Sequence, residues 1–78
     1  MKQKKLQTVI TFFTTDAAFR TESCAQAAGI AGRLMPVPRS LTADCGMAFS
    51  VAPEREEAVR RLLETEKIEY EAIQTGLF

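Results

Sequence analysis

The spacing of hydrophobic and polar positions changes between the periods of strands and helices along the chain. Thr8–Phe13 (TVITFF) is an uninterrupted β-branched and aromatic run, typical of a central strand with both faces covered. Three residues with N-cap side chains follow, Thr14, Thr15 and Asp16, so a helix is expected to begin there. Gly29 is placed to end it. The small residues at helical spacing that should face the core are Ala18, Thr21, Cys24, Ala25 and Ala28.

The second half of the chain repeats this alternation. Ile30–Met35 is a second apolar run, and because Pro36 follows it, an edge position in a sheet suits it. Gly46–Val51 alternates as a third strand. Pro53 then occupies the first position of a second helix. Its apolar stripe consists of Ala58, Val59, Leu62 and Leu63.

The last apolar segment has the period of a strand. Ile68–Ile73 (IEYEAI) alternates strictly, so we expect the fourth strand there and a short tail over Gly76–Phe78. The order of elements is then βαββαβ. For one small domain this order predicts an α+β fold, the ferredoxin-like plait, with a four-stranded antiparallel sheet and two helices on one face. We assign residues 8–78 to this domain and residues 1–7 to a basic N-terminal tail.

Composition and charge narrow the classes of function. The net charge is zero, so the sequence shows no excess of basic residues of the kind that binds nucleic acid. No apolar run approaches the roughly 20 residues of a membrane span. Val9–Phe13 is too short for a secretory signal, so a cytoplasmic location is expected. The chain has no histidine, and Cys24 and Cys45 lack the spacing of a zinc site. We therefore expect no metal and no cofactor.

The strongest candidate for chemistry is the segment Pro36–Gly46 (PVPRSLTADCG). Pro36 and Pro38 fix φ and remove two backbone donors, which predicts a stiffened loop between the second and third strands. Cys45 lies near its end, before Gly46, whose missing side chain would let a backbone approach closely. Cys24, in contrast, falls on the packed helix face and is expected to be a small core residue.

Chain direction places this loop beside the start of the first helix. The first and second strands run the same way, so the loop and Thr14–Asp16 are expected at one edge of the sheet. The helix N-terminus and Arg39 would both favour a thiolate at Cys45, whereas Asp44 opposes it or caps a turn instead.

Several segments of the chain resemble those of a known protein family. The matching segments are TFFTTDAAF, the helix end Ala28–Ile30 (AGI), LMPVPR, the pair Cys45 and Gly46, and Ile68–Glu71 (IEYE). In these segments the chain resembles the family of selenium/sulfur carrier-like proteins over about residues 8–73. Cys24 departs from the family, which usually has a larger aliphatic residue at that position. The resemblance implies that Cys45 holds zero-valent sulfur or selenium, as a persulfide or selenosulfide. It also implies a link to selenium metabolism, donor and acceptor proteins as partners, and a carrier rather than a stand-alone enzyme.

Two other functions stay open on the sequence. In the first, a regulatory or small-ligand module closes the loop over an anion at the helix N-terminus. The residues expected at such a site are Pro36, Pro38, Arg39, Asp44, Gly46, Thr14 and Thr15. In the second, the chain is a scaffold that forms a homodimer through its sheet face or the edge at the second strand. The sequence does not decide between sulfur and selenium.

Overall fold

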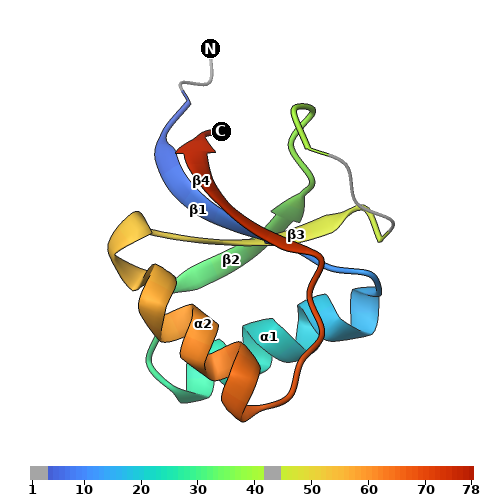
Figure 1. Ribbon diagram of the computed structural model, residues 1–78, viewed down its shortest axis with the longest axis vertical. Coiled ribbons are helices and arrows are strands. Elements are labelled where there is room, and N and C mark those ends of the chain that lie inside the picture. Colours follow the sequence, from blue (N-terminus) through green and yellow to red (C-terminus); the bar gives the residue numbers. More distant parts are fainter. Residues whose placement is uncertain (1–3, 42–44) are drawn as a thin grey trace.

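Two helices and four strands follow one another in the order β–α–β–β–α–β (Figure 1). The structure, a computed structural model, describes residues 4–41 and 45–78. The elements are β1 (Leu6–Thr11), α1 (Thr15–Ala27), β2 (Gly32–Pro36), β3 (Met47–Val51), the 3₁₀ turn η1 (Pro53–Arg55), α2 (Glu56–Thr65) and β4 (Ala72–Leu77). The strands form one sheet in the order β2-β3-β1-β4, in which all neighbours are antiparallel. The predicted ferredoxin-like plait is confirmed.

The core lies between the sheet and the two helices, which cover the same face (Figure 1). Ile10 and Phe12 from the β1 segment and Phe49 from β3 are almost fully buried there. From the helices come Ala18, Ala25, Val59 and Leu63, all at most 1% exposed. Neither helix in the described ranges is both long enough and apolar enough to cross a membrane.

Thr14 starts α1, as the sequence predicts. Its backbone is extended, with φ −134° and ψ 152°, and its hydroxyl accepts a hydrogen bond of 3.2 Å from the amide of Ala17. This bond satisfies one of the amide groups that the first helical turn leaves free. Since Thr14 is the cap, Thr15 and Asp16 belong to the helix itself.

Both helices end in the same hydrogen-bonded motif. Gly29 has φ +74°, and the amide of Ile30 donates to the carbonyl of Ala25 at 2.8 Å. After α2, Lys67 takes the left-handed conformation with φ 54°, and the amide of Ile68 donates to the carbonyl of Leu63 at 2.9 Å. These are Schellman motifs, in which the residue after the left-handed one folds back onto the helix.

The Schellman motifs displace two predicted strands. Ile30 and Ile68 are buried as the closing residues of helices, at 9% and 6% exposure, and neither belongs to a strand. β2 therefore begins at Gly32 rather than Ile30. The fourth strand, predicted at Ile68–Ile73, is wrong in position, because pairing with β1 begins only where the Glu71 amide donates to the Thr11 carbonyl at 2.7 Å.

β4 consequently includes most of the predicted tail. Gly76 pairs with Gln7 and Leu77 with Leu6, and the backbones of Phe78 and Lys5 exchange hydrogen bonds of 3.0 and 3.1 Å. β1 also begins earlier than predicted, at Leu6, and ends at Thr11. Phe13, predicted inside the first strand, follows it and is 49% exposed.

The core-facing residues predicted for the two helices are right in part. In α1, Ala18, Thr21 and Ala25 are buried and Cys24 is half-buried, but Ala28 is exposed. In α2, Val59 and Leu63 are buried, whereas Ala58 and Leu62 are half-buried.

Candidate functional site

The predicted loop between the second and third strands is a long hairpin loop tied at its base. Pro36 pairs with Met47, and one step further the amide of Val37 donates to the carbonyl of Gly46 at 3.2 Å. Inside the loop, the amide of Leu41 donates to the carbonyl of Pro38 at 2.9 Å, which closes a β-turn with Arg39 at its second position. Proline has no amide hydrogen, so the two hydrogen bonds that shape this loop are donated by Val37 and Leu41 and not by Pro36 or Pro38.

Cys45 is held by the backbone of the first residue of β3. Its Sγ lies 3.1 Å from the carbonyl oxygen of Met47, to which it donates, and accepts from the Met47 amide at 3.4 Å. Gly46, between them, has φ +74°, which brings the sulfur back over the residue two positions ahead. A Cβ at Gly46 would meet no atom of the described residues within 4 Å. The glycine therefore serves the left-handed turn, and the close backbone approach expected from the sequence stays a prediction.

The two cysteines are both free thiols and both half-buried. Cys45 packs against the hydrophobic core together with Leu34 and Met47, and Cys24 packs against it from α1. The predicted contrast between a loop thiol and a core thiol therefore does not appear in their exposure. It appears in their contacts, because within the described ranges only the sulfur of Cys45 takes part in hydrogen bonds.

Arg39 is exposed at the turn of the hairpin loop. The three ion pairs found in residues 4–41 and 45–78 all involve helix residues or the residue after α2, so none reaches Arg39. The stabilisation of a Cys45 thiolate by Arg39 stays a prediction. Asp44, the residue predicted to oppose it, lies outside the described residues.

The remaining predicted binding residues lie at the edge of the sheet that the topology predicts. β1 and β2 are both antiparallel to β3, so the end of β1, the start of α1 and the hairpin loop share one edge (Figure 1). Pro36, predicted in the loop, is the last residue of β2, because it still pairs with Met47, whereas Pro38 and Gly46 are in the loop. Thr14 caps α1 and Thr15 is its first residue. Thr14 is already engaged as the helix cap, whereas Thr15 is exposed without a described side-chain hydrogen bond.

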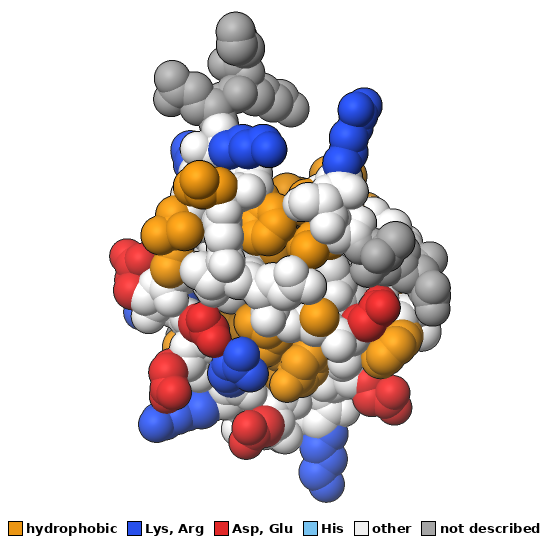
Figure 2. Space-filling view, turned by 45° about the horizontal axis from the view of Figure 1, so that its top comes forward, with side chains coloured by type: hydrophobic (Ala, Val, Ile, Leu, Met, Phe, Trp, Pro, Cys, Tyr) orange, Lys and Arg blue, Asp and Glu red, His pale blue; other side chains and the backbone are white. Residues whose placement is uncertain are grey.

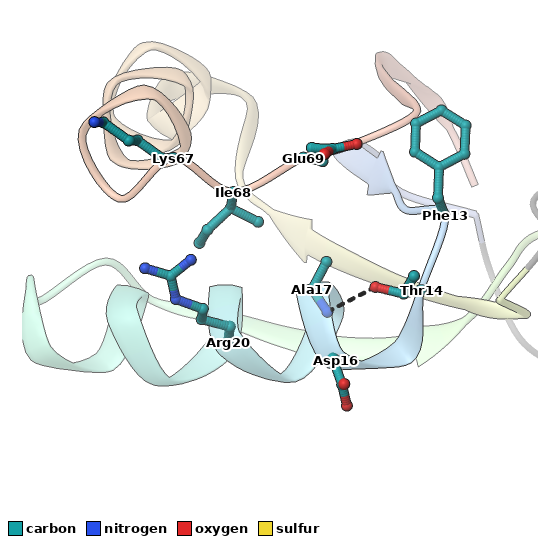
Figure 3. Close-up of a pocket in the computed structure, with 8 residues that line it drawn as sticks. All are labelled: Phe13, Thr14, Asp16, Ala17, Arg20, Lys67, Ile68 and Glu69. Atoms are coloured by element: carbon teal, nitrogen blue, oxygen red, sulfur yellow. Dashed lines mark hydrogen bonds between the residues drawn. The ribbon is translucent and has the colours of Figure 1, made fainter.

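A hollow of about 320 Å³ lies beside the start of α1 (Figure 3). It is bounded by residues of α1, by Phe13 and by the segment after α2; they are Phe13, Thr14, Asp16, Ala17, Arg20, Lys67, Ile68 and Glu69. Two cations and two carboxylates line it, so their charges cancel. None of the described loop residues lines it, so within the described part of the chain this hollow does not join the loop to the helix start as an anion site would require.

Sequence reasoning located the cysteine but missed the backbone groups that hold it. The contacts of Cys45 with Met47 depend on the left-handed φ of Gly46. The signal in the sequence is a cysteine followed by glycine directly before an apolar strand.

Comparison with known proteins gives one match. Residues 7–74 match the model of a family described as "Putative Se/S carrier protein-like". No curated protein and no solved structure matches the chain. The matched range runs from the start of β1 into β4 and contains the hairpin loop with Cys45 and Gly46. The chain therefore belongs to the Se/S carrier protein-like family.

Proposed function

We propose that this protein carries zero-valent sulfur or selenium on Cys45, as a persulfide or a selenosulfide. The observation that supports this proposal is the position of the Cys45 sulfur. It lies at the end of a hairpin loop, against the backbone of Met47, in a chain that belongs to the Se/S carrier protein-like family. A carrier needs one nucleophilic thiol that a partner protein can reach, and it needs no histidine base of its own.

The transfer is an exchange between sulfur atoms. The Cys45 thiol releases its proton to solvent, and the thiolate attacks the terminal sulfur of a donor persulfide. The sulfur–sulfur bond of the donor breaks, and its electron pair leaves with the donor thiolate. An acceptor thiolate then attacks the terminal sulfur on Cys45 and regenerates the Cys45 thiolate. One zero-valent atom moves at each step, without net oxidation, and selenium follows the same course.

The contacts with Met47 fit both states of the carrier. In the free thiol, the S–H group donates to the Met47 carbonyl while the Met47 amide donates to the sulfur. In the loaded form Sγ has no hydrogen, so the donation to the carbonyl is lost and the bond from the amide can persist. The half-buried position against the core also shields the sulfur from bulk solvent on one side.

Mass spectrometry of the intact protein tests the proposal. Wild-type protein treated with inorganic polysulfide, and freed of excess reagent, is expected to gain the mass of one sulfur atom. Cys45→Ser is expected to fold and to gain none, while the matched control Cys24→Ser loads as wild type. A loaded protein should then return to its starting mass when a thiol acceptor is added. Equal loading of Cys45→Ser and wild type would remove the proposal.

A further inference from the structure

Charged residues are divided between the two layers of the fold. Over the strands, the hairpin loop and the residues before β1, every charged residue that the structure describes is basic: Lys4, Lys5, Arg33 and Arg39. The described residues of the helices and of their connections carry nine carboxylates against five cations. Figure 2 shows cations but no acidic side chain at the top of the molecule, and acidic and basic side chains together over its middle and lower part. A chain of zero net charge therefore presents a basic sheet layer.

The basic layer contains a hollow of about 380 Å³, which we call the basic groove. It lies where β1 and β2 begin and β3 ends, and it is lined by, among others, Lys5, Leu6, Gln7, Gly32, Arg33 and Ser50. No described acidic residue lines it. Lys5 and Arg33 are both exposed and take part in none of the ion pairs found in the described ranges. Their charges are therefore available to a ligand.

The other polar groups of the basic groove already have partners. Ser50, which is 7% exposed, donates to Gln7 Oε1, and Gln7 Nε2 donates to the carbonyl of Phe78 at 2.9 Å. These bonds fix the floor of the groove and leave binding to the two cations at its rim. The planar guanidinium of Arg33 can hold a carboxylate through two parallel hydrogen bonds.

We propose that the basic groove binds a carboxylate-rich segment of the protein with which Cys45 exchanges sulfur or selenium. This proposal rests on the proposed function for the identity of the partner, and on charge complementarity for its chemistry. Ser50 in the groove is five residues from Cys45 in sequence, so at about 3.3 Å per residue the two lie no more than roughly 17 Å apart. A protein interface covers about 800 Å² of each partner, so one partner can occupy the groove and still reach Cys45.

The sheet surface favours protein over nucleic acid as this partner. Bases of single-stranded nucleic acid need aromatic side chains to stack on. On the face of the described central strands that points away from the helices, the positions are Gln7, Val9, Thr11, Ala48 and Ser50, none of them aromatic. Phe12 and Phe49 are buried in the core on the opposite side.

Titration of ¹⁵N-labelled protein with an octaglutamate peptide at low ionic strength tests the inference. Amide shifts are expected at Lys5–Gln7, Ala31–Arg33 and Ser50–Ala52, and they should weaken as salt is added. Arg33→Glu should lower the affinity at least about tenfold. The matched control is Arg61→Glu, whose side chain is 82% exposed on α2, and it should bind like wild type.

The outcomes separate this inference from the proposed function. Shifts confined to α2, or equal affinity of Arg33→Glu and Arg61→Glu, would overturn the inference. An octathymidine oligonucleotide that binds the groove more tightly than the peptide would overturn the assignment to protein. Arg33→Glu should still load sulfur from inorganic polysulfide as wild type does. Failure of Cys45 to load would overturn the proposed function and leave the peptide titration unaffected.

Discussion

The hydroxyl of Thr75 donates a hydrogen bond of 3.0 Å to Oε1 of Glu56, which joins the edge strand β4 to the first turn of α2. Since the only hydroxyl hydrogen of Thr75 is used in this bond, the buried Thr8 must be the donor in the 2.6 Å bond between the two threonines. On its other side, Glu56 accepts from Arg60 Nε at 3.0 Å. The hydrogen bonds from Arg60 and Thr75 lower the pKa of Glu56 below its ordinary value of 4.5.

The stability of the fold should therefore depend on the charge of Glu56. Because the folded pKa is the lower one, the stabilisation is present above pH 4.5 and is lost as the pH falls through the folded pKa. Glu56→Gln should be less stable than wild type at pH 7, and the difference should shrink toward pH 3. Urea unfolding across this range measures it, with Glu57→Gln, whose side chain is 86% exposed, as the control. Parallel pH profiles for wild type and Glu56→Gln would contradict the prediction.

Leu63 should matter more for stability than its neighbour Leu62. Leu63 is 1% exposed in the core, whereas Leu62 is half-buried. Leu63→Ala is expected to cost about 2–5 kcal/mol of the free energy of unfolding, and Leu62→Ala clearly less. Chemical denaturation of the two variants under one set of conditions makes the comparison. An equal loss would mean that the two side chains share the core.

Gly32 should not accept even one methyl group. A Cβ placed there would lie 2.6 Å from the ring of Phe49 and 2.8 Å from the carbonyl oxygen of Ser50. Phe49 is 1% exposed and has no room to withdraw, so Gly32→Ala should cost about 1–3 kcal/mol through overpacking. Arg33→Ala, at the exposed next position, is the control and should change the melting temperature little. A Gly32→Ala protein as stable as wild type would show that β2 can shift away from β3.

Gly46 should be needed for its conformation rather than for space. Its φ of +74° is strained for alanine, by about 1 kcal/mol, and better tolerated by asparagine. Gly46→Ala should therefore lose stability and load sulfur more slowly, since the turn sets the position of Cys45 against Met47. Gly46→Asn should lie closer to wild type in both measurements. The reverse order of the two variants would mean that the left-handed turn does not position the sulfur.

Arg39→Ala should slow the loading of Cys45 without a change of fold. A cation in the same loop would stabilise the attacking thiolate by about 0.2–1 kcal/mol, which corresponds to a change in rate of roughly 1.4- to 5-fold. The rate of persulfide formation would be followed against pH, with Arg55→Ala on the far side of the fold as the control. Identical profiles for wild type and Arg39→Ala would remove Arg39 from the carrier chemistry.

Periodicity was sufficient to predict the order of elements and the ferredoxin-like plait. It failed where a helix-ending motif takes the first residue of a predicted strand, after Gly29 in α1 and, without the usual glycine, after α2. Lys67 takes the left-handed position after α2, so Ile68 closes the helix, although IEYEAI alternates like a strand. In α2, the buried residues are Val59 and Leu63, whereas Leu62, on the same predicted stripe, is half-buried.

For the candidate site, the sequence was enough to place Cys45 in a loop beside the start of α1. It could not predict the contacts of the sulfur, because they depend on one backbone angle at Gly46. The basic groove could not be predicted either. The net charge of zero says nothing of how the charged residues are distributed over the fold, and that distribution depends on the order of strands in the sheet. Lys5 and Arg33 are far apart in sequence and line the same groove because β1 and β2 both flank β3.

The pairing of β4 with β1 has a consequence for synthesis on the ribosome. Residues 72–77 are the last strand of the fold to be made, and their partner, residues 6–11, is the first. Until β4 has left the ribosomal exit tunnel, one edge of β1 has no strand beside it, and Thr8 lacks the hydroxyl of Thr75. Closing so long a loop is also the slowest kind of contact to form. A nascent chain should therefore remain open to pairing with other strands until translation has passed β4.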